Sequence, residues 1–137
     1  MKIFLITPLA KYTPIGWLPL GLSYISASLK HNNHDVMLYD RFLRNHVLKD
    51  EESVNSEMKS EILKFKPDII GLSTYSNLIY DTAECARFIR KFYTGIIIAG
   101  GHHATAMPIQ TLKKIPELDY VFAGESESGM LALANGD

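Results

Sequence analysis

Residues 67–73, Pro67-Asp68-Ile69-Ile70-Gly71-Leu72-Ser73, contain the short apolar run that decides the fold. The run is contiguous rather than alternating, which is typical of a strand covered on both faces in a parallel sheet. Similar runs lie before and after it at intervals of about 24 to 33 residues, and together they are residues 3–6, 36–39, 69–72, 96–99 and 120–123. These intervals are long enough for a crossover helix between successive strands.

The segments between the runs carry apolar residues at helical spacing, and a proline or glycine often marks their ends. Pro19 suits the first turn of the first helix, and Asn32-Asn33 is expected to end that helix. Pro67 is expected to end the second helix. A further helix is expected from Pro108, with Leu112 and Ile115 inward, and another over 126–135. The three longer stripes are Leu18, Leu22, Ile25 and Leu29, then Val54, Met58, Ile62 and Phe65, then Ile79, Ala83, Ala86, Ile89 and Tyr93.

This alternation predicts an α/β fold in one domain over residues 1–137. The expected architecture is a three-layer, flavodoxin-like (Rossmann-like) open parallel sheet of five strands. Its strand order is 2-1-3-4-5, and helices cover both faces. The charged stretch 41–66 is interpreted as a solvated loop and helix face.

The composition excludes several classes of protein. The 137 residues are 47% apolar and 21% charged, with a net charge of -1, so no strong field attracts nucleic acid or an acidic membrane. The single cysteine, Cys85, forms no internal disulfide and is expected to pack within a helix. With only one cysteine, we expect a reducing, cytoplasmic setting. No apolar run has the length of a membrane span.

In folds of this kind a ligand binds beyond the carboxyl ends of the strands, here at loops 7–16, 73–77, 100–106 and 124–127. A receiver domain needs an acidic pair after the first strand, where this chain has Thr7-Pro8. The P-loop pattern GxxxxGK[ST], the dinucleotide pattern GxGxxG and the nucleophile elbow GxSxG are absent. The first loop also lacks the Ser/Thr/Gly-rich pattern expected for a flavin phosphate.

Two of these loops have unusual compositions. Gly100-Gly101 removes side chains at the sheet edge, so a large ligand can approach the backbone there, unless the turn only needs a positive φ. Ser73-Thr74-Tyr75 offers hydroxyl groups for a ligand, or for capping the next helix. His102-His103 is not expected to bind a metal, because adjacent side chains rarely reach one ion. Trp17, beside Gly16, lines a ligand wall or covers the core.

Five segments, in order, resemble the cobalamin-binding domain that precedes the catalytic domain in many radical S-adenosylmethionine enzymes. The family's motifs are P-x-G-L-x-Y-L, G-H-x-V, P-D-x-V-G-x-S, G-G-x-H-A-T and D-Y-V-x-x-G-E-x-E. In this sequence the corresponding segments are residues 19–25, residues 33–36 with Asp40 at the end of that strand, residues 67–73, residues 98–105 and residues 119–127.

The resemblance implies that cobalamin is the cofactor. Its corrin ring would lie against loop 7–17 and Gly124-Glu125, and its nucleotide tail beside 73–75 and Gly100-Gly101. No residue of this chain is assigned a catalytic or metal-binding role. The implied cofactor-binding residues are Thr7, Pro8, Gly16, Trp17, Ser73, Thr74, Tyr75, Gly100, Gly101, His102, His103, Gly124 and Glu125.

The chain departs from the family pattern after the first strand. Domains that ligate cobalt through histidine carry D-x-H-x-x-G there, whereas this chain has Pro8-Leu9-Ala10-Lys11-Tyr12-Thr13. The resemblance therefore implies a base-off cofactor without a histidine from this loop. Asn33 replaces the family's usual glycine, which the tolerance of asparagine for the left-handed region explains.

The catalytic part of such an enzyme is not contained in this sequence. A radical S-adenosylmethionine site needs three cysteines in a CxxxCxxC arrangement to hold a [4Fe-4S] cluster, and this chain has one. The resemblance thus implies an N-terminal fragment, ending at Asp137, of a methyltransferase or cyclase-like enzyme. Its S-adenosylmethionine and cluster would be bound by the missing C-terminal domain.

Two alternatives remain open from the sequence. The chain is either a degenerate member of the same family that binds no cobalamin and serves as a scaffold, or a flavodoxin-like flavin-binding protein. The residues around Thr13-Pro14 and Trp17 would support the scaffold if they filled the cavity.

Overall fold

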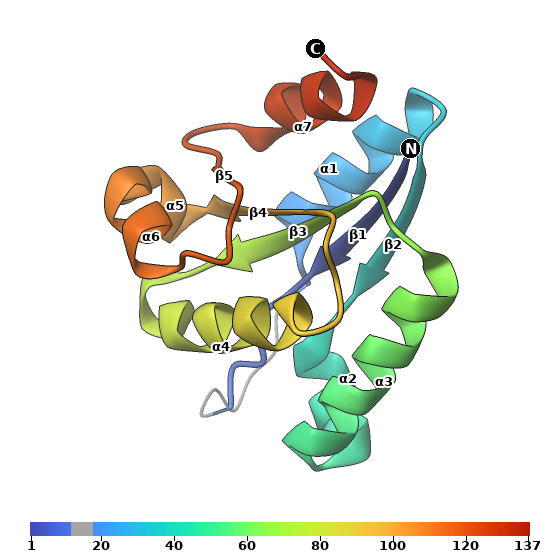
Figure 1. Cartoon of the computed structure of the whole chain (residues 1–137), viewed down its shortest axis with the longest axis vertical. Coiled ribbons are helices and arrows are strands. Elements are labelled where there is room, and N and C mark those ends of the chain that lie inside the picture. The colour runs from blue at the N-terminus through green and yellow to red at the C-terminus, as the bar shows by residue number, and fades with distance from the viewer. Residues whose placement is uncertain (12–17) are drawn as a thin grey trace.

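A computed structural model of the chain describes residues 1–11 and 18–137, and it contains a five-stranded parallel sheet (Figure 1). The strand order is β2-β1-β3-β4-β5, which confirms the predicted order 2-1-3-4-5. The strands are β1 (Lys2–Ile6), β2 (Asp35–Tyr39), β3 (Ile69–Thr74), β4 (Ile96–Gly101) and β5 (Tyr120–Val121).

The register explains why the apolar runs are contiguous. Ile3 of β1 lies between Val36 of β2 and Ile69 of β3, and Ile69 in turn pairs with Ile96 of β4. Successive side chains of β1 and β3 point to opposite faces of the sheet, and the side chains on both faces are buried. The reason is that helices cover both faces. The last strand is shorter than the run 120–123 predicted, and its Tyr120 is half exposed at the edge.

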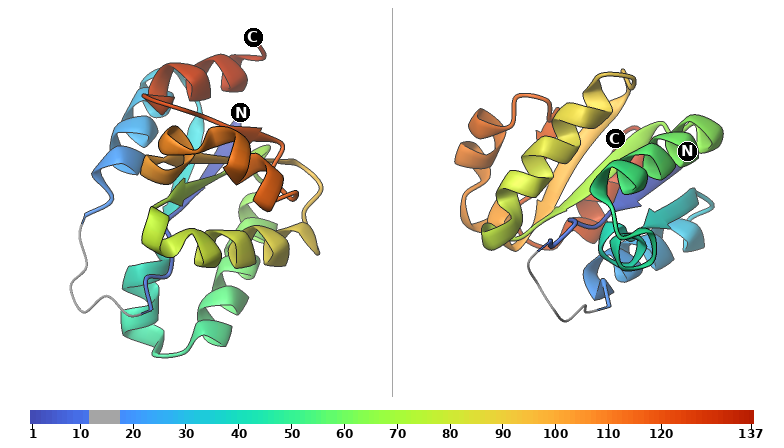
Figure 2. Two further views of the ribbon diagram at one scale, coloured as in Figure 1. Left: turned by 90° about the vertical axis from the view of Figure 1, so that its left-hand side faces the viewer. Right: turned by 90° about the horizontal axis from the view of Figure 1, so that it is seen from below.

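The helices form two outer layers (Figures 1 and 2). Helices α1 and α7 pack on one face of the sheet, and α3 and α4 pack on the other. Each pair of helices covers one of the two apolar clusters of the core. The helices are α1 (Leu20–His31), α2 (Arg41–Leu48), α3 (Glu51–Phe65), the short 3-10 turn η1 (Ser76–Leu78), α4 (Ile79–Arg90), α5 (His102–Ala106), α6 (Pro108–Lys114) and α7 (Ser126–Asn135).

Details at two helices differ from the sequence prediction. Leu18 lies before α1 and is 78% exposed, because the helix begins after Pro19, which caps it instead of lying in its first turn. In α6 the buried residue is Thr111, whereas Leu112 is exposed; the inward position of Ile115 is confirmed.

Helix α2 was not predicted, and it changes the interpretation of stretch 41–66. Its N-cap is Asp40, whose carboxylate accepts a hydrogen bond from the Leu43 backbone N–H. Its first residue, Arg41, is only 1% exposed. The stretch is therefore not wholly solvated, because one of its arginines is part of the interior.

The turn before β2 is built as the sequence predicted. Asn33 has a φ of 63°, in the left-handed region. Its backbone N–H donates to the Lys30 carbonyl, so the turn closes α1 directly. Asparagine tolerates this conformation better than other side-chain-bearing residues, which accounts for its place where the family usually has glycine.

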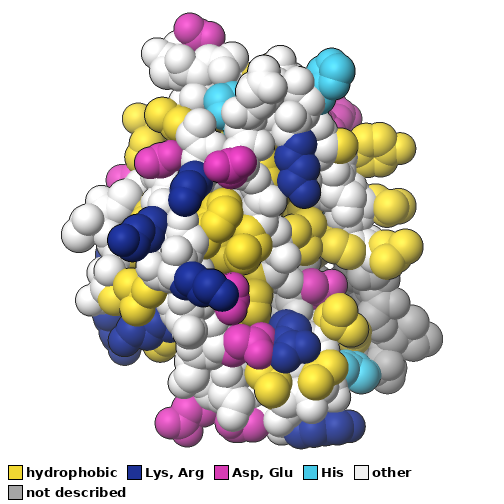
Figure 3. All heavy atoms as spheres, turned by 90° about the vertical axis from the view of Figure 1, so that its right-hand side faces the viewer, with side chains coloured by type: hydrophobic (Ala, Val, Ile, Leu, Met, Phe, Trp, Pro, Cys, Tyr) yellow, Lys and Arg dark blue, Asp and Glu magenta, His cyan; other side chains and the backbone are white. Residues whose placement is uncertain are grey.

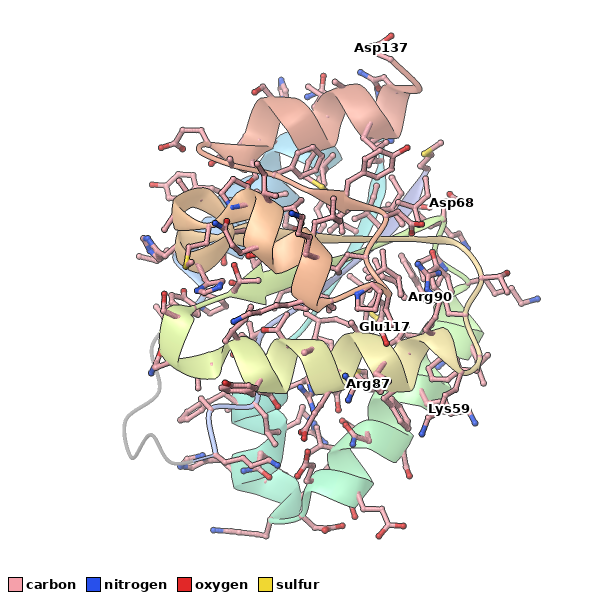
Figure 4. The ribbon with its side chains drawn as sticks, turned by 60° about the vertical axis from the view of Figure 1, so that its left-hand side comes forward. Lys59, Asp68, Arg87, Arg90, Glu117 and Asp137 are labelled. Atoms are coloured by element: carbon pink, nitrogen blue, oxygen red, sulfur yellow. The ribbon has the colours of Figure 1, made fainter. Side chains whose placement is uncertain are left out.

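Arg90 of α4 holds the loops together at the amino edge of the sheet (Figure 4). Its guanidinium donates to the carbonyls of Gly95 and Glu117, each at 2.7 Å, and to the Asp119 carboxylate at 2.7 Å. Asp119 also accepts the Ile97 backbone N–H. The connections that lead into β4 and β5 are thus fixed at this edge, and both termini lie near it as well (Figure 1).

The surface carries no extended region of one charge on the face shown in Figure 3, where basic side chains lie beside acidic ones. Within residues 1–11 and 18–137, no helix combines the length and apolarity that crossing a bilayer requires.

Candidate functional site

A cavity of about 560 Å³ lies between the sheet and helices α1 and α7. Its inner part is apolar: Leu5 and Ile98 contribute from the sheet, Leu22 and Ile25 from α1, and Met130 from α7. Its outer part reaches the carboxyl ends of β1, β3 and β4, where the predicted loops meet. This is the edge at which open parallel sheets bind ligands.

Two glycines lie on facing walls of the cavity, one closely packed and one beside open space. Gly71, in the middle of β3, lies between Leu5 and Ile98 in the register. A Cβ at this position would come within 2.9 Å of Leu5 Cδ2. Across the cavity, Gly21 of α1 has no atom within 4 Å of the place where its Cβ would stand. A slot therefore runs inward between the sheet and α1.

The mouth of the cavity collects most of the residues that the resemblance singled out. Strand ends and the loops after them contribute hydroxyl groups, exposed backbone and one imidazole. The predicted residues that line the cavity are Thr7, Pro8, Ser73, Tyr75, Gly100, Gly101, His102, Gly124 and Glu125. Gly16 and Trp17 lie outside the described residues.

Thr74 and His103 do not line the cavity, in contrast to their expected role. Thr74 is fully buried; its hydroxyl donates to the Gly100 carbonyl at 2.9 Å and accepts the Ala104 backbone N–H at 3.0 Å. His103 Nδ1 lies 3.0 Å from Ser76 Oγ. These side chains join β3 and η1 to the segment 100–104, so they shape the mouth from behind.

The two adjacent glycines of β4 serve different purposes. Gly101 has a φ of 113°, and a Cβ there would lie 2.8 Å from the Thr74 carbonyl oxygen, so both conformation and packing require glycine. Gly100 has no such φ, and its Cβ would face Ser126 Oγ at 3.0 Å across the cavity wall. The turn interpretation thus holds for Gly101, whereas Gly100 allows Ser126 to pack closely against β4.

A buried polar network supports the loop after β1. Thr7 Oγ1 donates to Asp40 Oδ1 at 3.0 Å and accepts the Arg41 backbone N–H at 2.9 Å. Two residues on, the Leu9 backbone N–H donates to Asp81 Oδ2 at 2.6 Å. Arg41 Nη1 donates to the same carboxylate oxygen at 2.9 Å. The loop is therefore anchored to both α2 and α4.

The ionisable residues of the lining are mostly acidic. Asp40, Glu125 and Glu127 contribute carboxylates, and His102, which lies 5.6 Å from Tyr75 between ring centres, is also in the wall. Within the described residues no lysine or arginine lines the cavity, and residues 12–17 contain none. In the same part of the chain no group of three His, Cys, Asp or Glu side chains is placed to hold a metal ion.

Several lining residues could not be singled out from the sequence. The inner wall comes from apolar residues that look like ordinary core, and from Gly21 and Gly71, which look like interruptions of a helix and a strand. Their only sequence signal is a glycine inside a regular element, which indicates close approach. That both belong to one cavity depends on how α1 packs on the sheet.

The sequence model of the B12 binding domain family matches residues 9–134 of this chain. An uncharacterized methyltransferase of Pyrococcus horikoshii is 30% identical over 133 residues, covering 93% of this chain and 27% of that protein. The anaerobic magnesium-protoporphyrin IX monomethyl ester cyclase of Rubrivivax gelatinosus is 27% identical over 119 residues, covering 86% and 20%. The chain thus spans about a quarter or less of the curated relatives that it matches.

Solved structures share the fold. A radical S-adenosylmethionine methyltransferase, TsrM from Kitasatospora setae, with cobalamin and a [4Fe-4S] cluster bound, aligns with a TM-score of 0.83 at 17% identity, over 98% of this chain and 26% of that one. The methanol:cobalamin methyltransferase complex MtaBC of Methanosarcina barkeri aligns with a TM-score of 0.70 at 14% identity, over 98% and 45%.

Proposed function

Because this chain belongs to the B12-binding domain family, we propose that it is a cobalamin-binding module and that the cavity at the carboxyl edge is its binding site. The observation that carries the proposal is the slot between the sheet and α1. Segments that resemble the family's motifs contribute its walls, at Gly21, Gly71, Gly100 and Gly124.

The residues present fit such a cofactor. The slot is open at Gly21, where a Cβ would meet nothing within 4 Å. The apolar inner walls suit a flat aromatic base, and the wider mouth suits a ring too large to be enclosed. Cobalamin, when bound, supplies a cobalt centre that can carry a methyl group or an electron.

The chain's own contribution is to bind and orient this cofactor. Ser73 and Tyr75 place hydroxyl groups at the mouth, and Gly100-Gly101 presents backbone without side chains. The buried anchors of Thr7 and Leu9 keep the first loop in place at the same mouth. Rigid walls of this kind reduce the entropy lost on binding.

We propose the base-off form without a protein ligand from the first loop. Leu9 is fully buried in the core on the α3 and α4 side, and Lys11 pairs with Glu51 at 2.5 Å. Within the described part of this loop, residues 8–11 have no histidine, cysteine or carboxylate. This part of the first loop therefore offers no imidazole, thiolate or carboxylate that could hold the cobalt.

The wider protein proposed here is a radical S-adenosylmethionine enzyme of the methyltransferase or cyclase-like type. The relatives of P. horikoshii and R. gelatinosus carry those two names, and both are several times longer than this chain. S-adenosylmethionine and an iron–sulfur cluster would then be held by a C-terminal catalytic domain. This chain, with Cys85 as its single cysteine, would bind the corrinoid without turning over substrate.

The flavin alternative is disfavoured by the family match, because the B12 binding domain model covers residues 9–134. The first loop also lacks the Ser/Thr/Gly-rich sequence expected for a flavin phosphate.

The test is reconstitution with hydroxocobalamin, followed by desalting and a visible spectrum. Cobalamin absorbance retained at about one equivalent supports the proposal; its complete loss on desalting would indicate the scaffold alternative. Yellow colour with flavin fluorescence in the purified protein would instead revive the flavin carrier.

A glycine variant links binding to the slot. Gly21→Leu places a side chain in open space beside the cavity, so it should block the cofactor while the fold persists, since glycine is the poorer helix former by roughly 1 kcal/mol. Gly21→Ala is the matched control and should retain most binding. Gly100→Leu should also abolish binding, although it must displace Ser126. Undiminished binding by Gly21→Leu and Gly100→Leu would contradict the assignment.

A further inference from the structure

Carboxylates flank the mouth of the cavity from both edges of the sheet. Asp40 directly follows β2, which is one edge strand, whereas Glu125 and Glu127 follow β5, the opposite edge strand. All three line the cavity. A ligand that covers the mouth therefore meets negative charge on two sides.

These carboxylates lack a neutralising partner among the described residues. None of them belongs to an ion pair in residues 1–11 and 18–137, and no cation lines the cavity there. Asp40 accepts hydrogen bonds from the Thr7 hydroxyl and the Leu43 backbone N–H through Oδ1. Glu127 is half-buried in the first turn of α7. Their charge thus acts on whatever occupies the mouth.

We propose that this acidic rim selects corrinoids whose peripheral side chains are amides over corrinoids in which an amide is replaced by a carboxylic acid. The inference rests on the proposed function. An amide donates N–H to a carboxylate in a charge-assisted hydrogen bond, whereas a carboxylate at the same place adds like-charge repulsion. The two ligands have almost the same shape, so charge is what distinguishes them.

The expected discrimination is roughly tenfold for a ligand carboxylate beside one wall carboxylate, since both remain partly solvated. It should decrease as salt rises, because mobile ions screen charges near the surface. Glu125→Gln combined with Glu127→Gln should reduce it without weakening the amidated ligand by a similar factor, since glutamine still accepts hydrogen bonds.

The experiment titrates the full chain with hydroxocobalamin and with its separated monocarboxylic acid derivatives, and follows the visible spectrum at low and high salt. Glu84→Gln is the matched control: it removes the same charge from an exposed site on α4 outside the cavity. The inference is supported by a roughly tenfold preference for hydroxocobalamin over at least one derivative. This preference should decrease at high salt and in the double variant, which keeps Asp40, and should be unchanged in Glu84→Gln.

The outcomes separate the two proposals. If hydroxocobalamin itself does not bind, the proposed function fails. If it binds and every derivative binds equally well, the acidic rim does not select. A preference that persists at high salt and in the double variant would show that shape, and not charge, discriminates, and it would overturn the inference.

Discussion

Removing the carboxylate of Asp81 should destabilise this protein severely, although the residue lies in the first turn of a helix. Asp81 pairs with Arg41 at 2.9 Å, and the two side chains are only 11% and 2% exposed. The same oxygen accepts the Leu9 backbone N–H. Asp81→Ala would therefore leave a buried guanidinium without its counter-charge and a backbone donor without its acceptor.

The expected loss is about 3–5 kcal/mol of unfolding free energy, the usual result of removing one partner of a buried ion pair. That is a large part of the roughly 5–15 kcal/mol that a domain of this size possesses. The network has little capacity to compensate, because Arg41 Nε and Asp81 Oδ1 already lack hydrogen-bond partners among the described residues.

Urea denaturation, followed by circular dichroism, measures this loss. Glu51→Ala is the matched control, since its pair with Lys11 is about one-third exposed on both sides, and it should cost about 1 kcal/mol at most. Arg41→Met combined with Asp81→Ala should recover part of the stability, because no buried charge then remains. If Asp81→Ala were as mild as Glu51→Ala, the burial of this pair would be refuted.

Two further predictions concern pH and backbone conformation. Burial raises the pKa of the Cys85 thiol to about 11, above its ordinary value near 9.0. The thiol's contribution to the free energy of unfolding should therefore be complete below pH 9 and decrease by up to about 3 kcal/mol as the pH rises through 11. Urea midpoints measured across this pH range test the prediction, and midpoints that do not change with pH would contradict it. Gly101→Ala should cost about 2 kcal/mol or more, because its Cβ would meet the Thr74 carbonyl oxygen, whereas Gly124→Ala, with a φ of 83° and open space, should cost only about 1 kcal/mol. Thermal unfolding compares them, and equal losses would show that the contact with Thr74 is not tight.

The mouth of the cavity could be located from the sequence because a parallel sheet brings its strand ends to one edge. Ser73, Gly100 and Glu125 each follow an apolar run, and the structure brings them together. Thr74 shows the limit of this reasoning. It is adjacent to Ser73 and equally polar, but the alternation of side chains along β3 turns its hydroxyl inward to Gly100 and Ala104.

Arg41 illustrates what local pattern could not predict. A charged residue in a charged stretch is usually solvated, and nothing near it in the sequence indicates otherwise. Its partners, Asn55 and Asp81, come from α3 and α4, which are far from Arg41 in the chain and meet it only in the packed structure. The burial of Arg41 is a property of three packed elements.

By itself the sequence predicted the strands, the two apolar layers and the edge at which the cavity opens, because these follow from local periodicity and from parallel connections between successive strands. The predicted strand order followed from the type of fold that this pattern indicates. Only the tertiary structure decided that Gly21 and Gly71 face one slot and that three carboxylates surround its mouth. The physical reason is that a cavity is the space left where side chains from distant segments fail to fill the gap between packed layers. Its shape and charge therefore depend on all of those segments at once.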